Sequence, residues 1–144
     1  MVTVSGSAET PLRTVPLPRT GGRVLVVEDH VPLNNMISEA LRSDGLEVDQ
    51  AADGRRAREM LRSGGYQVAV IDIRMPGLTG FELLEWASSE VPGCAVIMMS
   101  VVADPESRHR AATLGAVGFH QKLFELETLM GSVRSAFDVA EPMI

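Results

Sequence analysis

Short apolar runs alternate with segments of helical periodicity along most of this sequence, and this alternation restricts the fold more than any other feature. The apolar runs occupy residues 24–27, 46–51, 68–71, 95–99 and 116–119. Segments with helical spacing lie between and after them, around 33–41, 57–61, 81–87, 105–114 and 126–137. Apolar runs of this length are typical of parallel strands that are buried on both faces. Five strand–helix repeats therefore predict an α/β fold with one parallel sheet between two helical layers.

The first helical segment shows how the helices are recognised. One face is predicted to be buried because its apolar residues recur every three or four positions: Leu33, Met36, Ile37, Ala40 and Leu41. Gly45 follows where a helix C-cap is expected. Five strands are too few for an eight-stranded barrel, so we predict an open, doubly wound sheet. In such sheets the functional crevice lies at the carboxyl ends of the strands.

Composition excludes several classes of protein. A chain of 144 residues with 45% apolar residues is suited to one domain with its own core. The single cysteine excludes a disulfide scaffold and a Cys-rich zinc module. No apolar run approaches the ~20 residues of a membrane helix, and no secretory signal is visible. The net charge of −6 argues against direct nucleic-acid binding. We expect a cytoplasmic protein without a membrane partner.

The chain is predicted to have three parts. Residues 1–22 combine Pro, Ser and Thr without helical or strand periodicity, which predicts a flexible N-terminal tail. Residues 23–138 hold the five repeats and form the predicted domain. Residues 139–144 are a short C-terminal tail, too short for a DNA-binding domain, so we expect either a stand-alone domain or one piece of a longer regulator.

Polar residues follow four of the predicted strands. Glu28 and Asp29 end the first, Asp72 the third, Ser100 the fourth and Lys122 the fifth. Each alone could be a helix cap, a turn former or a solvated side chain. Together they predict three crowded carboxylates that need a hard cation, Mg²⁺, Mn²⁺ or Ca²⁺. A carboxylate nucleophile beside a cation and an amine suits phosphoryl transfer, so we predict an aspartate that accepts a phosphoryl group.

Lys122 is the only lysine in a chain with 13 basic residues. A compact ammonium suits a single phosphate oxygen beside a metal better than the planar fork of arginine does. The retention of lysine at this one position therefore favours a functional role for it.

Four segments in this order resemble the receiver domain of bacterial two-component response regulators. They are VLVVEDH at 24–30, VIDIRMPGLTGFELL at 70–84, VIMMS at 96–100 and GAVGFHQKLF at 115–124. The resemblance covers about residues 23–138 and implies a flavodoxin-like (βα)5 fold with strand order 2-1-3-4-5. It also implies that a histidine kinase or phosphotransfer protein is the partner, and that the chain is a signalling phosphoacceptor and not an enzyme with turnover.

The resemblance implies a role for each residue at the predicted site. Asp72 is the implied phosphoacceptor. Asp29, Asp72 and the backbone carbonyl of Arg74 are the implied Mg²⁺ ligands, and Glu28 acts through water.

Three further residues have implied roles in switching. Lys122 pairs with the phosphate, Ser100 is the switching hydroxyl, and Phe119 is the switching aromatic residue. The implied readout is a repacked face of the fourth helix, fifth strand and fifth helix. That face would control a partner or an output domain and could form a homodimer.

Two positions depart from the family pattern. Leu123 follows Lys122 where the family usually has proline. Val101 follows Ser100 where the family favours a small residue, and our hypothesis is that this stiff side chain narrows the entrance and slows phosphorylation.

Three alternatives remain at this stage. A haloacid-dehalogenase-type phosphatase needs a second acid two residues after the nucleophile, where this chain has Arg74. A flavin module needs a hydroxyl- and glycine-rich loop after the first strand, where residues 28–32 read EDHVP. A degenerate, phosphate-independent receiver would act as an interaction module. Separately, one basic run predicts either a solvated helix face or a docking patch: Arg55, Arg56, Arg58 and Arg62.

Overall fold

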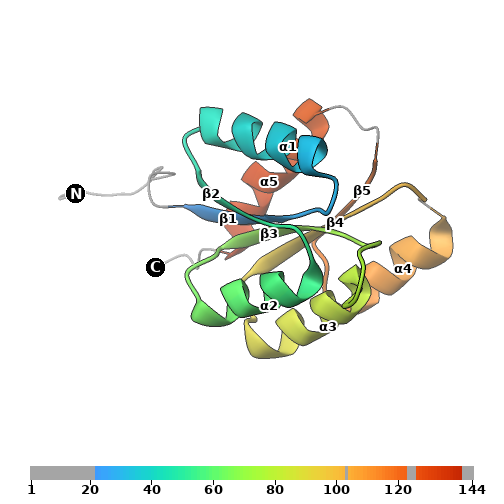
Figure 1. Ribbon diagram of the computed structural model, residues 1–144. Coiled ribbons are helices and arrows are strands. Elements are labelled where there is room, and N and C mark those ends of the chain that lie inside the picture. Colours follow the sequence, from blue (N-terminus) through green and yellow to red (C-terminus); the bar gives the residue numbers. More distant parts are fainter. Residues whose placement is uncertain (1–21, 103, 123–125, 141–144) are drawn as a thin grey trace.

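The computed structural model describes residues 22–102, 104–122 and 126–140. Strands and helices alternate strictly along the chain (Figure 1). The strands are β1 (Arg23–Val27), β2 (Glu47–Ala51), β3 (Val68–Asp72), β4 (Ala95–Ser100) and β5 (Gly118–Gln121). The helices are α1 (Val31–Ser43), α2 (Gly54–Ser63), α3 (Gly80–Glu90), α4 (Pro105–Thr113) and α5 (Leu126–Ala140).

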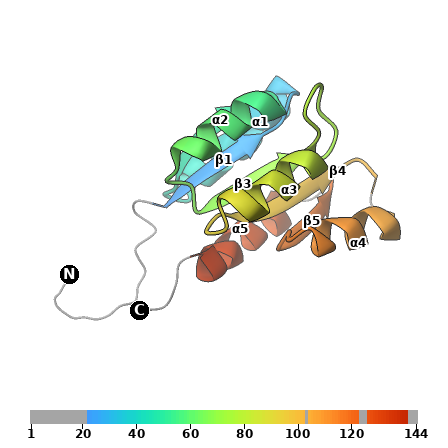
Figure 2. The same cartoon turned by 90° about the horizontal axis from the view of Figure 1, so that it is seen from below.

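All five strands are parallel and follow the order β2-β1-β3-β4-β5. Helices α1 and α5 cover one face of the sheet, and α2, α3 and α4 cover the other (Figures 1 and 2). The predicted doubly wound α/β fold and its strand order are therefore confirmed.

Each strand contributes side chains to two separate cores. Val24 and Val26 pack in the core beneath α1 and α5, whereas Leu25 and Val27 pack in the core beneath α2, α3 and α4. Every residue of β3 is buried. Alternation between two buried faces explains why these strands read as continuous apolar runs.

The buried face of α1 differs from the predicted one. Met36 is 49% exposed, so its assignment to the buried face is wrong. The helix instead buries the polar residues Asn34 and Ser38 on the same face as the apolar residues Ile37 and Leu41. The buried face is rotated because polar partners at the end of β1 accept hydrogen bonds from this part of the helix.

Two element boundaries also differ from the prediction. Strand β5 begins two residues later than the apolar run at 116–119 and includes His120 and Gln121. It pairs only with β4, and polar residues are tolerated at such an edge. Helix α5 continues to Ala140, past the predicted domain boundary at 138. The predicted N-terminal tail lies, apart from Gly22, outside the described residues, as does Leu123. Within the described part of the chain, no helix is both long and apolar enough to span a membrane.

Candidate functional site

The carboxyl ends of β1 and β3 lie next to each other in the middle of the sheet. Val27 and Ile71 are register partners, so the residues that follow them, Glu28 and Asp72, lie side by side at the same edge of the sheet. The chain turns toward β2 after β1 and toward β4 after β3, which makes this the point where the strand order reverses. Open α/β sheets bind ligands at this point.

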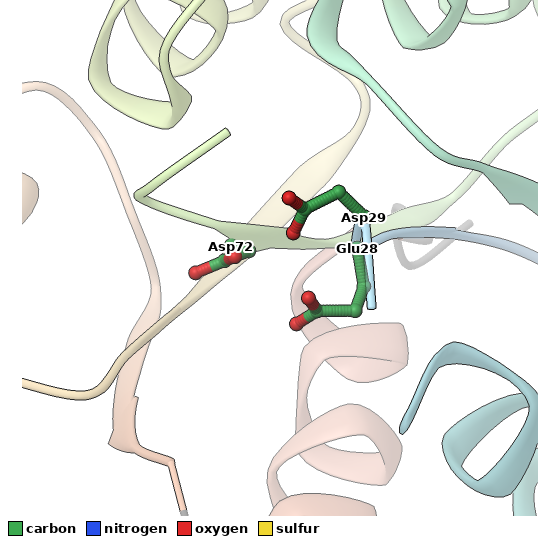
Figure 3. A group of neighbouring side chains, drawn as sticks. All are labelled: Glu28, Asp29 and Asp72. Carbon is green, nitrogen blue, oxygen red and sulfur yellow. The ribbon is translucent and has the colours of Figure 1, made fainter. Parts of the chain in front are cut away.

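Three carboxylates gather there, as predicted (Figure 3). Glu28, Asp29 and Asp72 each place one oxygen within 4.8 Å of the others. Glu28 and Asp72 are 0% and 1% exposed, while Asp29 is open to solvent. Like charges this close in a partly buried site raise the cost of ionisation, so the cluster favours positive charge nearby.

Lys122 supplies one such charge from the end of β5. Its Nζ donates a hydrogen bond to Asp72 Oδ2 at 3.0 Å and lies 2.8 Å from Glu28 Oε1. Burial lowers the pKa of Lys122, but the two carboxylates outweigh this effect and the pKa is raised overall. The ammonium therefore stays charged, and one positive charge faces three acidic groups.

Glu28 is the most deeply buried acid of the cluster. Burial is the main cause that raises its pKa, and the Lys122 ammonium and the backbone N–H of His30 act in the opposite direction. Glu28 Oε2 accepts that N–H at 3.0 Å. Among the described residues, Oε1 has one partner, the Lys122 ammonium at 2.8 Å. A buried oxygen with unused lone pairs fits a site that binds a hydrated cation.

Asp72 is held at both carboxylate oxygens. Oδ2 accepts from Lys122, and Oδ1 accepts the backbone N–H of Arg74 at 3.3 Å. Burial raises the pKa of Asp72 and Asp29 adds to the rise, while Lys122 and the Arg74 N–H oppose it. The carboxylate is thus fixed in orientation.

The loop after Asp72 depends on glycine. Gly77 has φ of 76°, which favours glycine. At Gly80, a Cβ would lie 2.4 Å from the carbonyl oxygen of Asp72 and 2.6 Å from the Cα of Ile73. The N–H of Gly80 donates to the Ile73 carbonyl at 2.9 Å. The start of α3 therefore packs directly against the backbone of Asp72 and fixes it.

Asn34 holds the backbone next to the acidic cluster through hydrogen bonds. This residue was not identified from the sequence. Its side-chain amide donates to the carbonyl oxygens of Glu28 at 3.0 Å and Ala51 at 3.2 Å. Ser38 and Gln50 in turn donate to Asn34 Oδ1. Polar residues at i and i+4 on an otherwise apolar helix face are the signal that could have indicated this network.

Ser100 and Phe119 lie on the two strands beyond β3. Ser100 is buried, its Oγ accepts the N–H of Val102 at 3.1 Å, and its carbonyl accepts the N–H of Lys122 at 2.6 Å. Phe119 is half-buried, outside the carboxylate cluster, with the guanidinium of Arg108 above its ring. Val101 is 52% exposed, and its predicted effect on phosphorylation stays a prediction.

An open cleft of about 670 Å³ borders the cluster on its solvent side. Asp29, Arg74, Phe81 and Arg110 are among the residues that line it. Arg110 stacks on the Phe81 ring at 4.3 Å from the centroid. A partner can therefore approach Asp29 between the β3–α3 loop and α4.

Comparison with known proteins decides the family. The family model described as "Response regulator receiver domain" matches residues 24–134. The chain belongs to this family. The receiver is thus a domain of two-component signalling systems, as the sequence resemblance implied.

Curated relatives are longer than this receiver. The transcriptional regulatory protein TcrA of Mycobacterium tuberculosis is 31% identical over 116 residues, which cover 81% of this chain and 46% of TcrA. The receiver spans about half the length of the curated relatives it matches.

Solved structures of other receivers have the same fold. The chemotaxis protein CheY4 of Vibrio cholerae has a TM-score of 0.75 at 31% identity, with 80% of this chain and 98% of CheY4 covered. The response regulator TrrA of Thermotoga maritima, solved in complex with Mg²⁺ and BeF, has a TM-score of 0.73 at 26% identity, with 80% and 98% covered. The receiver fold is therefore shared over nearly the whole of both proteins.

Proposed function

We propose that this receiver accepts a phosphoryl group on Asp72 from the phosphohistidine of a histidine kinase or a phosphotransfer protein. The observation that carries the proposal is the position of Asp72, buried at the reversal point of the sheet and bonded to the only lysine of the chain at 3.0 Å. Neighbouring acids and an ammonium are the combination that phosphoryl transfer to a carboxylate needs.

The transfer takes place in one step. One carboxylate oxygen of Asp72 forms a bond to phosphorus while the bond between phosphorus and the histidine nitrogen of the donor breaks. Lys122 lies where its ammonium can pair with an oxygen of the transferred group, after leaving the carboxylate that it bonds in the unphosphorylated chain. The N–H of Arg74 keeps the other carboxylate oxygen in place.

Mg²⁺ fits the chemistry of the donor set. Three acids face one ammonium, and within the described part of the chain that ammonium is the one partner of the buried Glu28 Oε1. We propose that Asp29, Asp72 and the carbonyl of Arg74 bind Mg²⁺ directly and that Glu28 acts through water. When bound, Mg²⁺ supplies positive charge to the phosphoryl oxygens. The Mg²⁺–BeF complex of TrrA supports the proposal.

We further propose that the phosphoryl group draws in the hydroxyl of Ser100 and that Phe119 moves into the space it leaves. The face of α4, β5 and α5 would then change and control a partner protein, an output domain or a homodimer. A regulator longer than this chain is consistent with the length of its relatives. We place this step in the cytoplasm, as the sequence predicted.

We propose a phosphoacceptor with self-phosphorylation and autodephosphorylation only, and not an enzyme with turnover. The test is incubation with Mg²⁺ and acetyl phosphate followed by intact-mass measurement of the wild type and of Asp72→Ala. We expect a mass gain of one phosphoryl group that the variant lacks. No gain in the wild type would favour the phosphate-independent interaction module, and turnover of a generic phosphate ester would favour a phosphatase.

A further inference from the structure

Helices α2 and α3 carry opposite charges, and the phosphoacceptor chemistry uses neither helix face. Helix α2 holds four arginines and one glutamate, while α3 holds three glutamates and no basic residue. The two helices contact each other and lie side by side on the same face of the sheet (Figures 1 and 2). One surface thus presents a basic strip next to an acidic strip.

The basic strip of α2 has a regular geometry. Arg55, Arg58 and Arg62 recur at i, i+3 and i+7, which places them along one side of the helix. Arg55 and Arg62 are exposed, and Arg58 is half-buried. Arg56 lies apart from them and pairs with Glu59 at 3.3 Å.

The acidic strip of α3 is not neutralised by α2. Glu82 and Glu85 recur at i and i+3, which places them on one side of the helix, and both are exposed. Both helices belong to the described part of the chain, and no ion pair within that part joins them. The charges of both strips therefore remain available to an external partner.

An aromatic residue lies between the two strips. Trp86, the only tryptophan of the chain, is half-buried on α3, and the guanidinium of Arg62 lies 5.7 Å from the centroid of its ring. Met60 of α2 is also half-buried and packs against the same core. Tryptophan, methionine and arginine are the residues enriched at the centres of protein interfaces.

We propose that this α2–α3 face binds the same face of a second copy of the chain. A second copy carries both strips at the same separation, so each basic strip can meet an acidic one. A two-fold axis that runs along the helices, between α2 and α3, places α2 of each copy on α3 of the other. An axis across the helices would oppose like charges, so the pattern selects one orientation of an isologous dimer.

A charge exchange tests this dimer without any use of phosphate, so its result is separate from that of the phosphoacceptor proposal. One variant reverses the basic strip (Arg55→Glu with Arg62→Glu), and a second reverses the acidic strip (Glu82→Arg with Glu85→Arg). Each is measured by sedimentation equilibrium at about 20 mM and about 500 mM salt, because screening weakens contacts between exposed charges. Circular dichroism checks that each variant is folded.

We expect the wild type to form dimers at low salt and to lose them at high salt. Either variant alone should remain monomeric, because both contacts of its dimer would be repulsive. An equimolar mixture of the two variants should dimerise again, since both contacts are then attractive and the pair has the same total charge as two wild-type chains. Emission from Trp86 in the mixture should differ from the average of the two separate variants, because Arg62→Glu alone already changes the surroundings of the ring.

A matched control separates position from net charge. Glu39→Arg with Glu47→Arg adds the same charge as the second variant but changes exposed positions of α1 and β2, so it should dimerise like the wild type. Three results would each overturn the proposal: a monomeric wild type at low salt, a mixture no more associated than its components, or a control that loses association. Dimers lost only by reversal of the basic strip would also overturn it and would point to a different acidic surface.

Discussion

The guanidinium of Arg108 on α4 lies 4.9 Å from the centroid of the Phe119 ring, and its Nη1 donates to the Phe119 carbonyl oxygen at 3.5 Å. These two contacts hold Phe119 in its half-buried position. If Phe119 moves on phosphorylation, as proposed, they stabilise the unphosphorylated form.

Arg108→Ala is therefore expected to tighten binding of beryllofluoride, a phosphoryl mimic. The loss of a cation–π contact worth about 0.5–1 kcal/mol predicts a gain in affinity of about twofold to fivefold. Calorimetric titration in the presence of Mg²⁺ measures it. Arg62→Ala removes a similar stack from Trp86 and should leave the affinity unchanged. Weaker binding by Arg108→Ala would contradict the expectation.

Lys122→Met should destabilise the fold in a pH-dependent way. It leaves Glu28 and Asp72 buried without their counter-charge, which predicts a loss of about 3–5 kcal/mol in the free energy of unfolding at pH 8. The loss should shrink in acid, because both carboxyls can then be neutral. Urea unfolding of the wild type and the variant, at pH 8 and again in acid, measures this loss. Arg56→Met breaks an exposed pair and should cost less than about 1 kcal/mol.

Asp72→Asn should stabilise the unphosphorylated chain at neutral pH. Burial raises the pKa of Asp72, so the ionised carboxylate is less favourable in the folded chain than in the unfolded one. A raised pKa contributes stability that is complete below the ordinary value of 3.8 and is lost as the pH rises through the folded pKa. The asparagine has no such loss.

The comparison of wild type and Asp72→Asn across pH isolates this group from the other acids. The difference in free energy of unfolding between the two proteins should be largest at neutral pH. It should shrink as the pH falls through the pKa of Asp72 in the folded chain toward 3.8. A difference that stays constant with pH would show that the carboxylate charge is not its cause.

Mg²⁺ should stabilise the folded chain, because a ligand of the folded state raises the free energy of unfolding by mass action. Asp29→Asn should weaken the Mg²⁺ affinity about tenfold or more, as loss of a ligand does. The effect of Mg²⁺ should fall in acid, where Glu28 and Asp72 take up protons. Thermal unfolding with and without Mg²⁺ measures both. Glu39→Gln on the exposed side of α1 should respond to Mg²⁺ like the wild type.

Gly80→Ala should destabilise the fold, because its Cβ would overlap the backbone of Asp72 and Ile73. Overpacking of this kind costs about 1–3 kcal/mol. Gly131→Ala is the matched control: it lies within α5 with no atom near the added Cβ, so it should stabilise the helix by up to about 1 kcal/mol. Chemical denaturation of both variants compares them. Equal effects would refute the role of close contact at Gly80.

The sequence predicted the convergence of Glu28, Asp29, Asp72 and Lys122 because strand ends are readable from apolar runs, and parallel strands put those ends at one edge. It did not predict Asn34, because periodicity records only where apolar residues lie. The i, i+4 spacing of Asn34 and Ser38 could have indicated a polar network, but it does not show which backbone carbonyls the Asn34 amide will reach.

Contacts between side chains on different helices and strands could not be predicted from the sequence either. The sequence assigned Phe119 a role but could not place Arg108 over its ring, and it left the arginines of α2 as either a solvated face or a docking patch. Both depend on which helices become neighbours and how they rotate about their axes. The shift of β5 has a similar cause, since an edge strand is defined by its hydrogen bonds and not by its hydropathy.

The contact between Lys122 and Asp72 spans 50 residues of sequence, and the Glu28 carboxylate joins it from the first strand. The acids are translated early, and their ammonium arrives only with the last strand. During synthesis, the nascent chain would therefore hold its carboxylates without the group that neutralises them until β5 docks. If the receiver accepts a phosphoryl group as proposed, this ability arises late in folding, and a chain truncated before Lys122 should gain no phosphoryl group from a phosphodonor.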